Sequence, residues 1–435
     1  MKNVLKICFL TLLVGMAIFA FAACSTPHEH SFADRWSTNA THHWHAGNCA
    51  HTQQVADMGE HTWTTEGKIT TPPTCISIGK NTFTCTTCGM TRNEDLDMTD
   101  HAYSDDSWGY VAIDNVLYHE KRCDICDQLA ERNEVPNALV AIDTEAAQEA
   151  LDNATDGSIL YLLPDVNYGI LYLRADANDI AVNVANWSDG NNMYYRVFKN
   201  LTIIGGEGSM LDGIWVEADT FTPSYPHSNS DTLPYLQSYV AIENLTIKDV
   251  TFSGLDNAFY VEGLASIDGL TFDGCSMDDE DGYNYLLFQN VAVETYHDLI
   301  SGEDFFTSGC KNISITNCNI VGVFSVVEMY GAENITITDN TFVAIGGNVF
   351  LLGSDNGSYE GTITIARNKV EGCADRFLSA DMVAADVVIT ENIIVDYLGM
   401  HMDIVSITNM TGESEITYNT WGAEELTVTV TAPAT

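Results

Sequence analysis

The chain has 435 residues, of which 46% are hydrophobic and 18% charged, so it can bury a core and is neither disordered nor fibrous. It contains 17 Lys and Arg residues and 61 Asp and Glu residues, which gives a formal net charge of −44. Binding of phosphate backbones or anionic lipid headgroups depends on Lys and Arg, so a surface this acidic repels both. The composition therefore excludes nucleic acid as a partner and leaves cation binding and solubility as explanations of the charge.

The first 23 residues have the features of a targeting segment. Lys2 and Lys6 precede an apolar stretch from Ile7 to Ala23, which is too short for a lasting membrane span. With the small residues before Cys24, residues 1–23 resemble a bacterial lipoprotein signal peptide. The resemblance implies that Cys24 becomes the lipidated first residue of a protein anchored in the bacterial cell envelope and facing outward. An ordinary secretory peptide cleaved nearby is the alternative, and it also predicts export.

A change in composition near Asn137 predicts two further regions: a Cys/His-rich region, 24–136, and a Val/Ile/Thr/Asn-rich region, 137–435. The first contains three repeated modules, each opening with His, any residue and an aromatic residue, and each supplying three more soft ligands. The candidate ligands are His30, His45, Cys49 and His51 in the first module, His61, Cys75, Cys85 and Cys88 in the second, and His101, His119, Cys123 and Cys126 in the third.

Four nitrogen or sulfur donors per module is the number that closes a tetrahedral structural zinc site. The segment from Cys85 to Gly89 resembles a zinc knuckle, in which glycine tolerates the positive φ of the turn. Disulfides are the alternative in an exported chain. The modules hold one, three and two cysteines, so disulfides cannot close each module separately, whereas mixed His/Cys sets can. His28, His42 and His43 stand outside the pattern and are interpreted as surface residues or alternative ligands.

Such modules resemble the Cys/His-rich repeats found near the lipid anchor of bacterial surface lipoproteins, which implies a role in spacing and display. No module leaves a coordination position open for water, so the predicted zinc is structural.

The second region opens with a short predicted helix, residues 144–151, which Asp143 or Thr144 can cap. A motif of alternating apolar and polar residues then recurs, starting at positions 245, 270, 313, 335, 363, 387 and 414. The intervals range from 22 (335 − 313) to 43 (313 − 270), and the long one has room for an insertion. A repeat of this size cannot bury its apolar face alone and must stack on copies of itself, so we expect a β-solenoid whose open end the helix caps.

One position of this repeated motif holds a compact residue, which is asparagine in the last four repeats. These residues form an aligned column: Asn340, Asn368, Asn392 and Asn419. With the strand pattern, this column resembles the right-handed, single-stranded parallel β-helix of pectate-lyase-like proteins over residues 137–435. The resemblance implies an all-β domain, preceded by the small zinc-ribbon-like modules, in which the asparagine amides form an internal ladder. Cys275 and Cys318 occupy the same column and are expected to be small buried packing residues.

Two loops, 220–238 and 278–310, carry aromatic, acidic and amide residues above the predicted scaffold. The candidate ligand-binding residues are Tyr225, Tyr235, Asp278, Asp279, Asp281, Tyr283 and Tyr285. Aromatic rings on such loops suit stacking against sugars, and they can equally cover the flank of the coil. The acids are interpreted either as a solvated turn or as a weak calcium site.

In related polysaccharide lyases, acids hold calcium against a uronate and an Arg or Lys abstracts the proton. Arg376, beside Asp375, is the candidate base, with an ordinary surface ion pair as the alternative. The His-Gly pair of polygalacturonases and a Gly-x-Ser-x-Gly nucleophile are absent from 137–435. We therefore assign no catalytic residue and predict a lipid-anchored surface protein whose β-helix binds carbohydrate or a surface protein. A polysaccharide-active enzyme, a calcium-dependent lyase before a glycoside hydrolase, is the alternative.

Overall fold

The computed structural model describes two compact units, and each is treated by itself. The described residues are 29–48, 54–175, 180–182, 193–217, 220–221, 235–236, 238–262, 265–289, 295–297, 304–307, 309–353, 358–381, 383–397, 399, 401, 403–421 and 427–433. The predicted signal peptide, the lipidation residue Cys24 and the candidates Cys49, His51 and Tyr225 lie outside these ranges. Among the described residues, no helix has the length and apolar composition needed to cross a bilayer.

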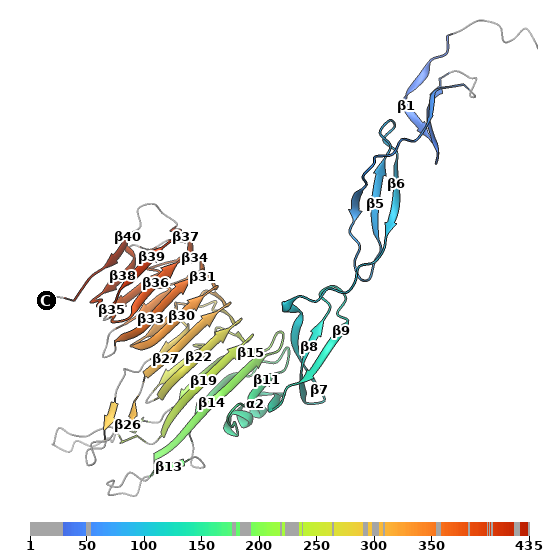
Figure 1. Cartoon of the computed structure of the whole chain (residues 1–435). Coiled ribbons are helices and arrows are strands. Elements are labelled where there is room, and N and C mark those ends of the chain that lie inside the picture. The colour runs from blue at the N-terminus through green and yellow to red at the C-terminus, as the bar shows by residue number, and fades with distance from the viewer. Residues whose placement is uncertain are drawn as a thin grey trace, which may run out of the picture. The chain divides into compact units, whose positions relative to one another are not determined.

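Three small antiparallel sheets follow one another in the Cys/His-rich region, one in each predicted module (Figure 1). Their strands are β1 (Phe32–Thr38), β2 (His42–Gly47) and β3 (Val55–Glu60); β4 (Lys68–Thr71), β5 (Gly79–Thr84) and β6 (Thr91–Leu96); and β7 (Trp108–Ile113), β8 (Val116–Arg122) and β9 (Leu129–Glu134). A short 3-10 helix, η2 (Asp105–Ser107), precedes β7. The first compact unit comprises 1–107 and 122–130.

This first unit has almost no hydrophobic core. Its buried residues, among those the structure describes, are Gly79 and three candidate ligands, His43, Cys85 and Cys123. Every residue of β4, and five of the six in β6, is exposed. Small domains that bury so little apolar surface depend on a metal or on cross-links for their stability.

The second unit comprises 108–121 and 131–435 and is a parallel β-helix. The first sheet of the coil is formed by β10 (Ala138–Ala141), β11 (Ile159–Leu162), β14 (Met193–Gly205), β19 (Ser238–Lys248), β22 (Ala265–Asp273), β27 (Gly309–Thr316), β30 (Ala332–Thr338), β33 (Tyr359–Ala366), β36 (Asp386–Thr390) and β39 (Ser414–Thr417), with β13 (Ile180–Val182) antiparallel to β14. The second sheet is formed by β15 (Met210–Leu211), β20 (Thr251–Phe252), β23 (Ser276–Asp278), β28 (Asn319–Val321), β31 (Thr341–Ile345), β34 (Lys369–Cys373) and β37 (Ile393–Tyr397). The third sheet is formed by β12 (Ile170–Arg174), β16 (Gly213–Glu217), β21 (Phe259–Glu262), β24 (Tyr285–Gln289), β29 (Ser325–Met329), β32 (Phe350–Leu352), β35 (Leu378–Asp381), β38 (Asp403–Thr408) and β40 (Thr427–Val430).

From β14 to β38, each turn of the coil contributes one strand to each of these sheets, and each strand pairs in parallel with its counterpart in the next turn (Figure 1). Two antiparallel hairpins project from the coil, one of β17 (Thr220–Phe221) with β18 (Tyr235–Leu236) and one of β25 (Thr295–His297) with β26 (Asp304–Thr307). The second hairpin lies in the long interval between repeats. The predicted all-β parallel β-helix is confirmed.

Helix α2 (Thr144–Asp152) caps the open end of the coil, as the sequence predicts. Asp143 is its N-cap, and the side chain accepts a hydrogen bond from the backbone N–H of Ala146 at 2.8 Å. Ala147 and Leu151 on its inner side are fully buried in the same apolar core as the first coil strands. The cap removes from water an apolar surface that an end of a solenoid otherwise exposes.

The β7–β8 hairpin packs on the outside of the coil rather than with the earlier modules. Leu117 of β8 is buried against Tyr161 and Ile204, and the Tyr161 hydroxyl donates to the carbonyl oxygen of Tyr110 at 3.4 Å. The coil itself starts with β10 at Ala138, whereas the compact unit that contains it begins at Trp108.

The asparagine column forms a buried ladder between the first and second sheets. Each Nδ2 donates to the Oδ1 of the next residue: Asn340 to Asn368 at 2.8 Å, Asn368 to Asn392 at 3.0 Å, and Asn392 to Asn419 at 2.9 Å. Each amide also donates to a backbone carbonyl, for example Asn368 to Ile337 at 2.9 Å. Cys275 and Cys318 lie buried in the same column, and each thiol donates to a backbone carbonyl oxygen. The polar groups at this turn are therefore satisfied in a dry interior.

Candidate functional sites: two Cys/His clusters and an aromatic face

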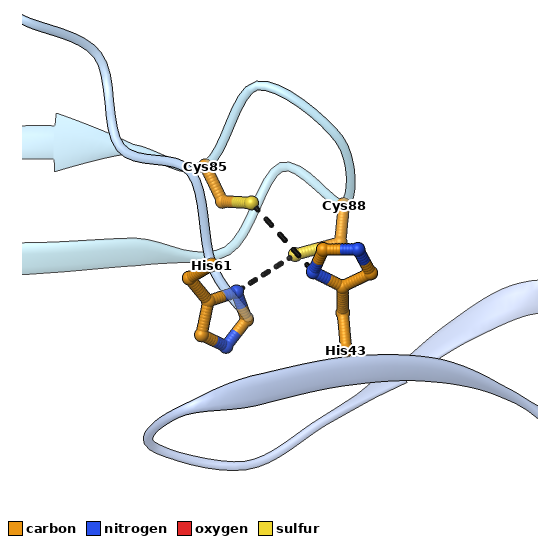
Figure 2. A group of neighbouring side chains, drawn as sticks. All are labelled: His43, His61, Cys85 and Cys88. Carbon is orange, nitrogen blue, oxygen red and sulfur yellow. Dashed lines mark hydrogen bonds between the residues drawn. The ribbon is translucent and has the colours of Figure 1, made fainter. Parts of the chain in front are cut away.

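The first cluster consists of His43, His61, Cys85 and Cys88. One ligand atom from each lies within 4.8 Å of the others, with Cys88 Sγ 3.4 Å from His61 Nδ1 and Cys85 Sγ 4.0 Å from His43 Nδ1. Figure 2 shows the four side chains pointing toward a common centre. Two sulfurs and two imidazole nitrogens at this separation can close around one tetrahedral metal ion.

The second cluster consists of Cys75, His101, Cys123 and Cys126, and its ligand atoms also lie within 4.8 Å of one another. Cys75 Sγ is 3.7 Å from Cys123 Sγ, and Cys126 Sγ is 3.2 Å from His101 Nδ1. All described cysteines are free thiols in the structure. The donor set is three sulfurs with one imidazole nitrogen, ligands that zinc accepts.

The same turn presents the cysteine pair in both clusters. The N–H of Gly89 donates to the carbonyl of Cys85 at 3.0 Å, and the N–H of Asp127 donates to that of Cys123, also at 3.0 Å. Gly89 and Asp127 both adopt positive φ, 74° and 60°. Asp127 therefore occupies the glycine position of the second turn, which an aspartate tolerates better than most residues.

The turn geometry favours the metal-binding form of one cysteine in each cluster, whereas burial raises the pKa of Cys88 and raises that of Cys75 to about 11. Burial raises the pKa of Cys85, but hydrogen bonds from the backbone of Cys88 and Thr87 and from the His61 side chain outweigh it and lower the pKa to about 6. Burial and the corresponding bonds around Cys123 have the same net effect, a pKa of about 6. Thiolates, not thiols, ligate metals, so each turn supplies one cysteine in the form that binds a metal ion.

The sequence predicts one closed set of four ligands per module. The two clusters correct this grouping, because each takes one ligand from the module before. His43, set outside the pattern, joins three residues of the second module, and Cys75 of the second module joins three residues of the third. The two extra ligands precede their partner histidines by different intervals, 18 (61 − 43) and 26 (101 − 75) residues. No fixed spacing in the sequence identifies them.

Three other predicted ligands that the structure describes lie outside both clusters: His30, His45 and His119. The His45 ring packs at 3.9 Å from the ring centroid of Trp36. His119 stacks at 4.6 Å from both Trp108 and Tyr110, and burial lowers its pKa. Both rings therefore pack against aromatic side chains among the described residues, and the predicted ligand set of the first module stays a prediction because Cys49 and His51 lie outside those residues.

An aromatic row crosses the outer side of the third sheet. Tyr172, Trp215, Tyr260 and Phe288 pair in register on four successive strands, with centroid distances of 6.1, 5.2 and 5.5 Å. Their strand neighbours, such as Leu171 and Val216, point into the core, so alternation places the row outside.

Two further rings extend the row beyond Phe288. The Tyr285 ring lies 4.9 Å from that of Phe288, and the Phe324 ring lies 5.8 Å from that of Tyr285. We call these six residues the aromatic face: Tyr172, Trp215, Tyr260, Phe288, Tyr285 and Phe324. The six rings form a contiguous, partly exposed aromatic strip on the coil.

Acidic groups border the aromatic face. Glu217 follows Trp215 by two residues on β16 and is exposed, and Glu328 pairs in register with Phe288. The Glu328 carboxylate accepts a hydrogen bond from the Tyr330 hydroxyl at 2.8 Å. Burial, and then the charge of Glu328, raise the pKa of Tyr285, so its phenol keeps its proton and remains a hydrogen-bond donor at neutral pH.

One end of the aromatic face opens into a pocket of about 1080 Å³ beside helix α2. The pocket is lined by Thr144, Glu145, Gln148, Glu149, Asp152, Asn153, Ile170, Tyr172, Arg174 and Arg196. Gln148 fixes the backbone of Tyr172 through two hydrogen bonds, of 2.8 and 2.9 Å. Arg174 is paired with Asp152 at 3.4 Å. Since Tyr172 belongs to both, the pocket continues the aromatic face.

Of the predicted ligand residues that the structure describes, only Tyr285 belongs to the aromatic face. Tyr283 is 77% exposed, and Tyr235 lies in β18, paired with Phe221 of β17. The four residues of the aromatic row, Tyr172, Trp215, Tyr260 and Phe288, could not be predicted because they come one per turn at unequal intervals.

The predicted calcium site at Asp278, Asp279 and Asp281 has no support among the described residues. Asp279 is 2% exposed, and its carboxylate accepts four backbone N–H groups, at 2.8 to 3.0 Å, from residues 281 to 284. Its oxygens are therefore committed to holding the turn. The acids join no group of metal-ligand atoms in the described part of the chain.

Arg376, the candidate base, lies in a polar cluster with its side chain 19% exposed. Its guanidinium donates to Asp403 at 3.2 Å and contacts His401 Nδ1 at 3.0 Å. Burial raises the pKa of Asp403, but the hydrogen bond and charge of Arg376 lower it by more, so the net shift of the pKa is downward. These contacts fit the ion pair that the sequence left open as the alternative to a catalytic base.

Comparison with solved structures finds a likeness to a crystal structure of alginate lyase from Paenibacillus sp. str. FPU-7. The identity is 12% and the TM-score 0.23, over 65% of this chain and 99% of that chain. A likeness at this level carries no information on substrate or activity. No protein-family model matches the chain, and no curated protein matches it significantly.

Proposed function

We propose that the β-helix is a carbohydrate-binding domain that acts without catalysis. The observation that carries this proposal is the aromatic face, six rings in contact across the third sheet and its edge. Sugar rings present apolar C–H faces that stack on aromatic rings, and a row of rings fits successive residues of a glycan. Strands of a sheet lie about 4.8 Å apart, so the scaffold sets the ring spacing before a ligand arrives.

The ligand class follows from charge. Glu217 and Glu328 border the aromatic face, and Arg174 near its end is already paired with Asp152. With a chain net charge of −44, this surface repels uronates and sulfated sugars. A neutral polysaccharide is therefore the ligand that the surface fits best.

The Cys/His-rich region has a structural role in the same proposal. Each cluster holds one zinc ion, because its four donor atoms lie close enough to share one ion and the described residues of the first unit form almost no other core. Export and anchoring through a lipid on Cys24 rest on the N-terminal sequence. Together they make the modules a spacer that carries the binding domain away from a bacterial membrane.

The test uses the chain from Ser25 onward and a panel of neutral and acidic polysaccharides. Retention is measured by affinity electrophoresis, and unsaturated products and reducing ends are followed in parallel. We expect retention on a neutral glycan, without product, and loss of retention in Trp215→Ala with Tyr260→Ala. Tyr418→Ala is the matched control, because Tyr418 is 84% exposed and lies outside the aromatic face. Product release, or retention only on acidic glycans, would contradict the proposal.

A further inference from the structure

Each Cys/His cluster has three ligands from one module and one from the module before it. His61, Cys85 and Cys88 come from the module that begins at His61, and His43 comes from the preceding one. The second cluster repeats the arrangement with His101, Cys123 and Cys126 from the third module and Cys75 from the second.

The three ligands of each set are assembled by their own module. The N–H of Thr86, next to Cys85, donates to the carbonyl of Thr62, next to His61, at 2.9 Å. In the third module, the N–H of Asp124 donates to the carbonyl of Ala102 at 3.0 Å. These equivalent bonds hold each cysteine turn beside its histidine, so one position remains for a ligand from elsewhere.

The fourth ligands sit on different elements of their own modules. His43 is on strand β2, with its side chain buried, and Cys75 is in the loop before β5. What the two share is that they reach the turn of the following module. Since the first unit buries almost nothing else, these contacts are the main buried links between its modules.

We propose that each zinc ion is a joint that locks a module to the one before it. This inference rests on the proposed zinc binding and adds to it that the metal acts between modules, not within them. A lipid-proximal spacer built this way is stiff when metal is bound. When the metal is removed, neighbouring modules are no longer held together.

The experiment cuts the chain between two modules and asks whether metal holds the pieces together. In the full chain from Ser25 onward, residues 97–100, which follow β6 and precede His101, are replaced by a specific protease site. The cleaved protein is kept reduced and run on size exclusion, and its zinc is counted. We expect the two pieces to elute together with zinc bound and to separate when a strong chelator removes it.

Variants assign the joint to Cys75. Cys75→Ser should release the pieces, whereas Cys75→His, which restores a soft ligand, should hold them. His43→Ala is the matched control, because it opens the other joint and leaves this one closed. Cys123→Ser with Cys126→Ser should remove one zinc ion per chain and also release the pieces.

The failures are distinguishable. Pieces that separate while zinc stays bound in full would overturn the joint and leave the zinc proposal intact. Protein without zinc would overturn both. Pieces that stay together after chelation under reducing conditions would show that contacts other than metal join the modules. In a parallel sample left unreduced, pieces that separate only when reductant is added would show disulfides.

Discussion

The Nδ1 atom of His43 lies 4.0 Å from the Sγ atom of Cys85, although the two residues belong to different modules. They are also two of the few buried side chains in the first unit, the part of the chain with the least apolar burial. The stability of this unit and its candidate metal sites therefore depend on the same residues.

Removing the metal should unfold the first unit and leave the coil intact. The coil has a continuous apolar core with dozens of fully buried residues, whereas the described residues of the first unit form none comparable. After a strong chelator is added to reduced protein, limited proteolysis should cut within 29–107 and leave a stable fragment containing 137–435. Protection of both regions from protease after complete zinc removal would contradict this prediction.

Asn368→Ala should destabilise the coil. The Asn368 side chain is 1% exposed, donates to Ile337 and Asn392, and accepts from Asn340, so its loss leaves several buried polar groups unpaired. We expect a loss of about 3 kcal/mol, measured by urea denaturation. Asn334→Gly is the control, because Asn334 bonds Asn312 at the surface and its φ of 58° suits glycine. Equal losses for the two variants would show that burial of the ladder is unimportant.

Asp279→Ala should destabilise the turn that precedes β24, and calcium should not protect the wild type. Four backbone N–H groups lose their acceptor in the variant, for a cost of about 2 kcal/mol. Asp281→Ala serves as the control, because Asp281 is exposed. Thermal unfolding with and without millimolar calcium checks both points. A rise in melting temperature with calcium that Asp279→Ala abolishes would restore the calcium site.

Asp403 should contribute to stability at neutral pH and not in acid. Its pKa in the folded chain is net lowered from 3.8, because Arg376 outweighs burial, so folding favours the ionised form. Its contribution is present above the unfolded-state pKa and disappears as pH falls through the lowered value. The stability difference between wild type and Asp403→Asn should therefore be larger at pH 6 than at pH 3 in urea denaturation. A difference independent of pH would contradict the assignment.

Much of the fold could be predicted from the sequence, because strand alternation and the asparagine column recur once per turn. The column alone fixes the register of Asn340, Asn368, Asn392 and Asn419, which the structure then bonds in that order. The capping helix follows from equally local signals at Asp143.

The sites were harder to predict, because they depend on how turns of unequal length align. Tyr172, Trp215, Tyr260 and Phe288 are separated by 43, 45 and 28 residues, so no fixed period aligns them. The cysteine pairs and their histidines were recognisable as local motifs. The fourth ligands, His43 and Cys75, were not, since their place is set by how one module meets the next.

The central claim is that the aromatic face binds a neutral glycan, and calorimetric titration tests it most directly. An oligosaccharide of the retained polysaccharide is titrated into wild type, Trp215→Phe, and Trp215→Ala with Tyr260→Ala. We predict that the double variant loses about 3 kcal/mol, roughly a hundredfold in Kd, while Trp215→Phe, which keeps a ring, and Tyr418→Ala lose little. Equal affinity in a folded double variant would contradict the account.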